Sequence, residues 1–135
     1  MDLARVEIRC ADFMAEGFRP QLRFATIFSM EVFYYFEDIQ RGIDKAVSLL
    51  APGGWLMVMV DFYEENLISH SWPEDLQTPM VRWSRQQYED GFAAAGLIDV
   101  QQYRYIDSRN PNWNAEDQGT LCTVGQKARP STATS

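Results

Sequence analysis

The pattern of apolar and polar positions along the chain predicts strands of two kinds. Val6 to Cys10 alternates apolar with polar residues, which is typical of an extended strand with one face covered. Phe24 to Phe28 and Trp55 to Val60 are continuous apolar runs, too short for a typical helix, and they predict strands buried on both faces, as in a parallel sheet. Ile98 to Ile106 and Thr120 to Val124 predict two further strands, paired antiparallel at the end of the domain.

Two helices are predicted between these strands. From Ile39 to Leu50, apolar residues recur at offsets of 4, 7, 8 and 11, which places them on one helical face. Asp38 can cap the start of this helix, and Pro52-Gly53-Gly54 stops it. Ser84 opens a capping box for the second helix, which ends at Gly96. The order of elements predicts an α/β layered domain.

Three segments have no sustained period. The stretch from Phe62 to Met80 contains two prolines and a mixture of aromatic and acidic residues, and its length marks it as a candidate lid. Ser108 to Gly119 is rich in Asn, Pro and Asp, which predicts a loop between antiparallel partners. Residues 128–135 are expected to form a disordered tail.

Composition and charge limit the classes of partner and site that we expect for this protein. The 135 residues are about the length of one domain, and 12 basic against 19 acidic residues give a net charge of −7. This charge repels nucleic acid and anionic membranes, so a small or cationic partner is expected. Cys10 and Cys122 lie far apart with no CxxC spacing, so neither a zinc site nor a redox pair is predicted. No run approaches the roughly 18 apolar residues of a membrane span, and the N-terminus lacks a signal-peptide core, so a cytoplasmic protein is expected.

Polar and aromatic side chains follow the Trp55 strand, where open α/β sheets place their ligand sites. They are Asp61, Tyr63, Glu64, Glu65, Asn66, His70 and Trp72. This group is the predicted substrate side, although the two glutamates could equally be solvated loop charges. His70 is the only histidine, and the chain has no G-x-S-x-G elbow, so a serine hydrolase is disfavoured.

Three motifs in fixed order carry a family resemblance. Ala11-Asp12-Phe13, Ser29-Met30-Glu31-Val32 and Leu50-Ala51-Pro52-Gly53-Gly54 are followed by a capped helix ending Ala94-Ala95-Gly96-Leu97. Together they resemble the class I S-adenosylmethionine-dependent methyltransferases of the type 11-like group, nearly to residue 126. The resemblance implies an incomplete Rossmann-like sheet, mostly parallel with a C-terminal antiparallel strand pair. Residues 1–127 would then be a methyltransferase-like domain, the C-terminal two thirds of that fold.

The resemblance also implies site residues. Asp12, followed by Phe13, would accept the adenine amino proton of S-adenosylmethionine, and Ser29, Met30 and Glu31 would line the pocket for its methionine part. Asp12 could instead be a turn residue, and Glu31 an acid that favours the start of a helix. On the acceptor side we expect Tyr34, Tyr35, Tyr63, Glu64, Asn66, His70 and Trp72. Most aromatics in such a run simply pack. No catalytic residue and no metal ligand is assigned.

The sequence departs from the family pattern in three places. It has no glycine-rich turn after a first strand and no acid after a second, and Ala25 stands where the family often has an aspartate. In the family sheet order, 3-2-1-4-5-7-6, strands 1 and 2 lie between the Val6 strand and the Phe24 strand. Those two strands must therefore pair directly, or the Phe24 strand presents an unpaired edge that invites self-association. We also expect weaker cofactor binding and low stability.

Two functions remain open at this point. The first is S-adenosylmethionine-dependent methyl transfer to a small-molecule acceptor, impaired in this chain by the missing elements. The second is a non-catalytic methyltransferase-like remnant that acts as an interaction or regulatory protein through its sheet edge. A third possibility is that Met1 is not the true start and a glycine-rich run lies upstream in the gene.

Overall fold

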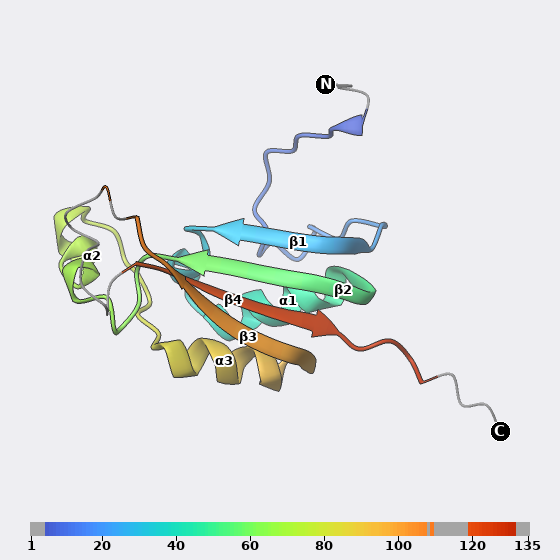
Figure 1. Cartoon of the computed structure of the whole chain (residues 1–135). Helices are drawn as coiled ribbons and strands as arrows, with labels where there is room; N and C mark the ends of the chain where they lie inside the picture. Colours follow the sequence, from blue (N-terminus) through green and yellow to red (C-terminus); the bar gives the residue numbers. More distant parts are fainter. Residues whose placement is uncertain (1–4, 108, 110–118, 132–135) are drawn as a thin grey trace.

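One mixed sheet organises the chain, and the computed structural model describes it over residues 5–107, 109 and 119–131. The strands lie in the spatial order β1-β2-β4-β3, and β4 alone runs against the other three (Figure 1). The strands are β1 (Phe24–Met30), β2 (Leu50–Val60), β3 (Leu97–Tyr105) and β4 (Thr120–Lys127). This order equals the 4-5-7-6 half of the expected family sheet, so the predicted fold class is confirmed.

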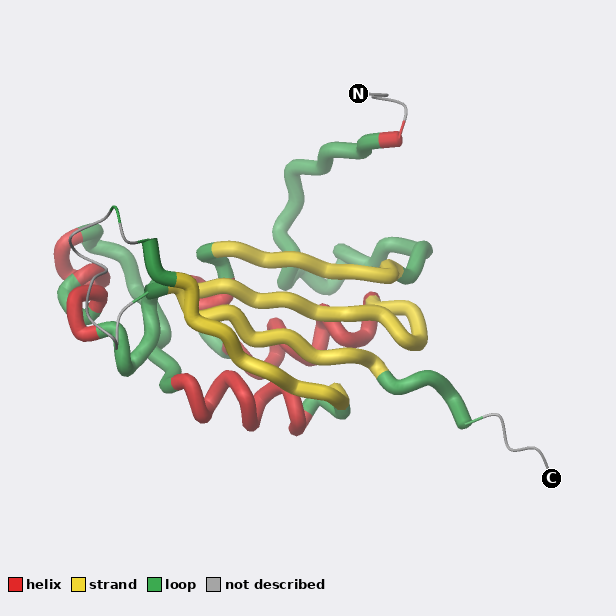
Figure 2. The backbone as a smooth tube through the Cα atoms, viewed as in Figure 1, coloured by secondary structure: helices red, strands yellow, loops and turns green. Residues whose placement is uncertain are grey.

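The two longer helices, α1 (Ile39–Leu49) and α3 (Arg85–Ala94), lie on one side of the sheet (Figure 2). Asp38 caps α1 as predicted, because its side chain accepts a hydrogen bond from the Arg41 backbone amide at 3.2 Å. Ser84 and Gln87 form the predicted capping box of α3, each side chain accepting from the other's backbone amide. Gly96 follows α3 with φ of 87°, a left-handed conformation that glycine adopts without strain.

Two adjacent glycines, Gly53 and Gly54, form a tight turn near the start of β2. Gly53 has a φ of 81°, and a Cβ at Gly54 would lie 2.8 to 3.0 Å from three backbone oxygens. A side chain therefore has no room at Gly54, because β1 and the turn approach each other there. The helix ends at Leu49, close to the predicted end, but the strand begins at once, so Pro52-Gly53-Gly54 lies within β2 and not ahead of it.

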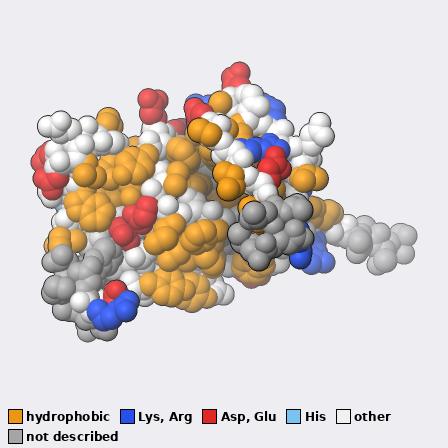
Figure 3. All heavy atoms as spheres, turned by 90° about the horizontal axis from the view of Figure 1, so that it is seen from above, with side chains coloured by type: hydrophobic (Ala, Val, Ile, Leu, Met, Phe, Trp, Pro, Cys, Tyr) orange, Lys and Arg blue, Asp and Glu red, His pale blue; other side chains and the backbone are white. Residues whose placement is uncertain are grey.

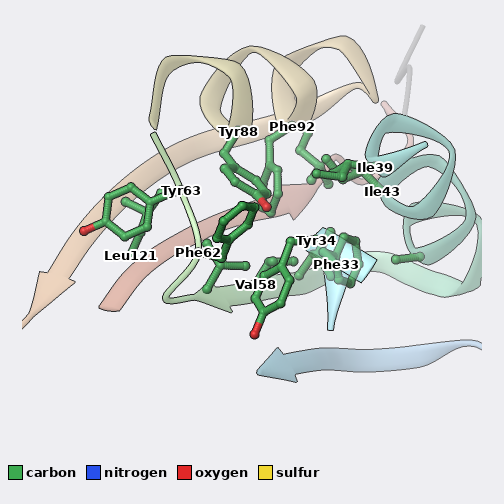
Figure 4. Close-up of a cluster of buried hydrophobic side chains, with 14 of the residues drawn as sticks. Phe33, Tyr34, Ile39, Ile43, Val58, Phe62, Tyr63, Tyr88, Phe92 and Leu121 are labelled. Carbon is green, nitrogen blue, oxygen red and sulfur yellow. The ribbon is translucent and has the colours of Figure 1, made fainter. Parts of the chain in front are cut away.

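The hydrophobic core fills the space between the helices and the sheet (Figure 4). α1 contributes Ile39 and Ile43, and α3 contributes Tyr88 and Phe92, all at 0 to 1% exposure. From β2, alternate residues point into this layer. They are Leu56, Val58 and Val60.

Three strand predictions need correction. Val6 to Cys10 is not a strand: it is an irregular exposed segment, with Ile8 91% exposed. Alternation of apolar and polar residues is not enough to form a strand, because the backbone also needs a hydrogen-bonding partner. No strand of the described chain lies beside this segment. β1 exists, but it is not buried on both faces, since Phe28 is 57% exposed. The reason is that β1 is the edge strand and no helix covers its second face. The Trp55 run in β2 is not buried on both faces either, because Trp55 is 39% exposed while its neighbour Leu56 is fully buried.

The segment from Phe62 to Met80 contains two short helical pieces within irregular backbone. These are the 3-10 helix η3 (Leu67–Ser69) and α2 (Trp72–Asp75), and a further 3-10 helix, η2 (Phe33–Tyr35), follows β1. The predicted β3 and β4 strands are antiparallel neighbours, as expected. The loop predicted over 108–119 and the tail over 128–135 fall largely outside the described residues. None of the helices that the structure describes is long and apolar enough to cross a membrane.

Candidate functional site

Acidic side chains meet where β1 and β2 end. The two strands are parallel, so their carboxyl ends lie at the same edge of the sheet. Glu31 directly follows β1 with φ of 60°, and its backbone amide still donates to the Met59 carbonyl of β2 at 2.9 Å. Asp61 directly follows β2. The strained left-handed backbone at Glu31 turns the chain out of the sheet and into η2, which marks a special position.

One carboxylate oxygen of Glu31 has a hydrogen-bond partner, and the other has none among the described residues. Its Oε2 accepts a hydrogen bond from the Tyr34 hydroxyl at 2.6 Å, and Figure 4 shows that hydroxyl pointing toward the end of β1. Its Oε1 is buried and receives no hydrogen bond from the described residues. Ser29 Oγ, at the end of β1, is buried without a partner in the same way. Buried polar atoms without partners are costly, so they indicate a place where a ligand or proton belongs.

Asp61 is better supported. Thr120 Oγ1 of β4 donates to its Oδ1 at 2.6 Å, and its backbone carbonyl accepts from Asn66 Nδ2 at 2.7 Å. Burial raises the pKa of Asp61, and the Thr120 hydrogen bond opposes that rise. Asp61 was predicted to mark the end of its strand, and the structure brings it beside Glu31.

Burial also raises the pKa of Glu31, to about 7. The hydrogen bond from Tyr34 lowers this pKa, and the neighbouring charge of Asp61 raises it. Burial raises the pKa of Tyr88 above the usual tyrosine range, with the charge of Glu31 adding to the effect. The pKa of Glu31 therefore lies near neutral pH, because burial outweighs the hydrogen bond from Tyr34.

A pocket of about 440 Å³ lies beside Tyr34, the hydrogen-bond partner of Glu31. It is lined by Tyr34, Tyr35, Trp72, Asp75, Leu76 and Met80. The Tyr34 and Tyr35 rings lie 4.6 Å apart between centroids, and Trp72 stacks on Phe62 at 6.5 Å. Tyr34 therefore joins the two features, because its ring lines the pocket and its hydroxyl contacts Glu31. An acid pair, aromatic walls and Asp75 together favour a ligand that carries positive charge.

The first motif lies along α1. Asp12 Oδ1 accepts a hydrogen bond from the Met14 amide at 2.9 Å, which is the turn geometry considered above. Asp12 also borders a second pocket, of about 290 Å³, with Tyr35 and Arg41 among its other walls. Phe13 stacks on Phe36 at 5.9 Å. The pocket lies between the Asp12 loop and the segment that follows β1.

The structure separates the remaining predicted residues into inward and outward groups. Tyr63 is buried and donates to the Gly119 carbonyl at 2.9 Å, and Asn66 is buried under Asp61. Glu64 forms an ion pair with Arg82 at 2.6 Å, and its carbonyl lies 2.7 Å from His70 Nε2. These contacts hold the irregular segment in place. That Tyr63, Glu64, Asn66 and His70 contact a ligand remains a prediction.

Met30 differs from its neighbours in the motif. It is 52% exposed, and its side chain lies on the face of the sheet that the helices leave open, because residues adjacent along a strand point to opposite faces. Ser29 faces the helix side. Tyr88, Thr120 and Asp75 approach or border the site but were not predicted, since nothing in their local sequence indicates which neighbours they meet. Within the described ranges, no group of three or more metal-ligating side chains is close enough to hold an ion.

No protein-family model matches the sequence, and no curated protein matches it either. Several solved structures are similar to this chain. A chain of the complex between the Haloferax volcanii Trm112 methyltransferase activator and a methyltransferase is 30% identical, with a TM-score of 0.73 over 88% of this chain and 60% of that chain. The N-methyltransferase NodS from Bradyrhizobium japonicum WM9, in complex with S-adenosyl-L-homocysteine, is 22% identical, with a TM-score of 0.61 over 87% of this chain and 52% of that chain.

Human N-acetylserotonin methyltransferase, in complex with S-adenosylmethionine, is 15% identical, with a TM-score of 0.64 over 89% of this chain and 33% of that chain. This chain therefore spans between 33% and 60% of the length of these three structures. At such low sequence identity, the similarity is a similarity of fold. It extends over 87 to 89% of the present chain.

Proposed function

We propose, from the class I S-adenosylmethionine-dependent methyltransferase fold that this chain shares, that it supplies part of a site for methyl transfer to a small-molecule acceptor. The observation that carries this proposal is the convergence of Ser29, Glu31, Tyr34 and Asp61 at the carboxyl ends of two parallel strands. Open α/β sheets bind ligands at that edge. NodS and human N-acetylserotonin methyltransferase, which share the fold, have S-adenosyl-L-homocysteine and S-adenosylmethionine bound.

The described residues fit one side of a cofactor pocket. Ser29 Oγ is a buried, unpartnered atom where the resemblance expects the methionine part, and Asp12 borders a pocket where it expects adenine. When bound, S-adenosylmethionine supplies a methyl group on a positively charged sulfur. Asp12 would accept the adenine amino proton beside Phe13, and Ser29, Met30 and Glu31 would line the rest, Met30 and Glu31 through their backbone.

The acceptor would occupy the neighbouring aromatic pocket. Tyr34, Tyr35 and Trp72 would orient it and exclude water, which is the main requirement for transfer to a good nucleophile. Asn66 and Tyr63 would hold the floor of the site through their contacts with Asp61 and Gly119. Glu64 and His70 would fix the covering segment.

Calorimetric titration of the purified chain with S-adenosylhomocysteine tests the cofactor half of this proposal. We expect saturable binding that weakens about tenfold in Asp12→Ala, which corresponds to the loss of one hydrogen bond to a charged group. Glu89→Ala, an exposed carboxylate on α3, is the matched control and should bind like the unchanged chain. Absence of heat from a chain that circular dichroism shows to be folded would contradict the proposal.

A second candidate function is an interaction or regulatory protein, and the exposed edge favours it. β1 is the edge of the sheet in the described chain, and Phe28 and Met30 are more than half exposed. Figure 3 looks onto the molecule from the β1 side and shows hydrophobic side chains gathered there around a few acidic ones. Such an edge invites strand addition or self-association. The Haloferax volcanii neighbour comes from a complex with an activator protein.

Sedimentation of the chain at increasing concentration tests this second function. The interaction function would be favoured if the chain associates, if Phe28→Lys abolishes that association, and if the unchanged chain binds no S-adenosylhomocysteine. A monomer at all concentrations would speak against self-association through β1.

A further inference from the structure

We propose that the methyl acceptor is an amine, bound as its ammonium ion between the Glu31 and Asp61 carboxyl groups and the aromatic wall formed by Tyr34, Tyr35 and Trp72. This inference rests on the proposed function and adds a substrate class to it.

The first step of the argument is uncompensated charge. Three ion pairs are formed by the described residues, and none of them includes Glu31 or Asp61. Their hydrogen-bond donors, the Tyr34 and Thr120 hydroxyls, are neutral. A partly buried carboxylate pair without a cation is unfavourable unless a proton or a positively charged ligand joins it.

The second step is an acceptor atom that needs a donor. Glu31 Oε1 is buried and unpartnered while Oε2 is occupied by Tyr34. Beyond it, Tyr88 is 0% exposed and its hydroxyl has no partner either. Figure 4 shows that hydroxyl directed from α3 toward Phe62 and Tyr34. An ammonium group has three donors and a positive charge, so it meets the need at Glu31 Oε1 better than a neutral hydroxyl does.

The third step is the wall beside the acids. Tyr34 and Tyr35 tilt against each other at 4.6 Å, and Trp72 lines the same pocket of about 440 Å³ with Asp75. Aromatic faces attract cations, and a carboxylate at the pocket rim adds to the attraction. Among the residues that line this pocket there is no lysine or arginine. The pocket and the acid pair therefore both favour a positively charged ligand.

The acid pair can also take the proton that methylation of an amine requires. An ammonium ion gives one proton to Glu31, which frees the nitrogen lone pair. The nitrogen then forms its bond to the methyl carbon as the carbon–sulfur bond of the methyl sulfonium donor breaks, and that electron pair stays on sulfur. The proton leaves the carboxyl pair to solvent when the site opens.

A matched pair of probes tests the inference on the full chain: 2-phenylethylamine and 2-phenylethanol, titrated by calorimetry with and without saturating S-adenosylhomocysteine. We expect the amine to bind at least tenfold more tightly than the alcohol. Glu31→Gln and Asp61→Asn should each reduce amine binding at least tenfold and leave the alcohol unchanged, while Glu89→Gln should change neither. Equal binding of the two probes, or full amine binding in Glu31→Gln, would overturn the inference.

A second variant protects the test if either acid variant fails to fold. Trp72→Leu keeps an apolar side chain but removes the ring, and we expect amine binding to fall about fivefold; an unchanged affinity overturns the inference. The two proposals fail differently. A chain that binds S-adenosylhomocysteine but no amine refutes the amine acceptor alone, whereas one that binds the amine but no S-adenosylhomocysteine refutes methyl transfer.

Discussion

Replacing Glu31 with Gln should make the protein more stable above neutral pH. Gln keeps the length of the side chain, the left-handed backbone and an oxygen that can accept from the Tyr34 hydroxyl, so the difference reports the buried charge. Below pH 4.5 both folded and unfolded chains carry a neutral Glu31. Between pH 4.5 and 7 only the folded chain keeps the proton, so its stability falls as the pH rises.

The magnitude follows from the two pKa values. The pKa rises from 4.5 to about 7, a difference of about 2.5 powers of ten in proton affinity. At roughly 1.4 kcal/mol for each power of ten this is about 3.4 kcal/mol at most. The carboxyl is partly exposed, so screening by solvent reduces the expected effect to about 1 to 2 kcal/mol.

Urea unfolding followed by tryptophan fluorescence at pH 5, 6, 7 and 8 measures this difference. We expect Glu31→Gln and the unchanged chain to be about equally stable at the acid end, and the variant to gain about 1 to 2 kcal/mol by pH 8. Glu89→Gln on the exposed face of α3 should follow the unchanged chain throughout. Parallel curves for Glu31→Gln and the unchanged chain would refute the reasoning, because they would mean that Glu31 is not held away from water.

Three further predictions test the fold. Ser84→Ala removes the capping box of α3 and should cost about 1 kcal/mol in the free energy of unfolding, measured with urea; no loss would mean that the cap is not formed. Gly54→Ala should cost about 1 to 3 kcal/mol, because its Cβ meets backbone oxygens, whereas Gly17→Ala, with open space around it, should be nearly neutral, and equal effects would contradict the tight turn. A thiol reagent should modify Cys10, which is exposed, in the folded chain and reach buried Cys122, whose pKa burial raises, only after unfolding; rapid reaction of both would contradict the packing of β4.

Local sequence signals were sufficient for the helices and for most strands. The Asp38 cap, the capping box at Ser84 and the glycines after each helix act within a few residues, so the chain itself carries the information. The short apolar runs that form β1 and β2 could likewise be recognised, and the family resemblance predicted the order of the four strands that the sheet contains.

The failures concern positions whose state depends on distant neighbours. The Val6 segment alternates like a strand, yet a strand also needs a hydrogen-bonding partner, and none of the described strands lies beside it. The Phe24 run was expected to be buried on both faces, but burial depends on which elements cover a strand, and β1 lies at the edge. Composition and periodicity contain no information about either.

The candidate site divides in the same way. The sequence alone determined that Ser29, Glu31 and Asp61 lie at the ends of two strands, because strand ends are local features, and parallel strands share an edge. Only the tertiary structure decided that Thr120 supports Asp61, that Tyr88 brings an unpartnered hydroxyl from α3, and that Glu31 keeps a bare oxygen. Those contacts join residues up to 59 positions apart, and burial by several elements at once is what raises the pKa values there.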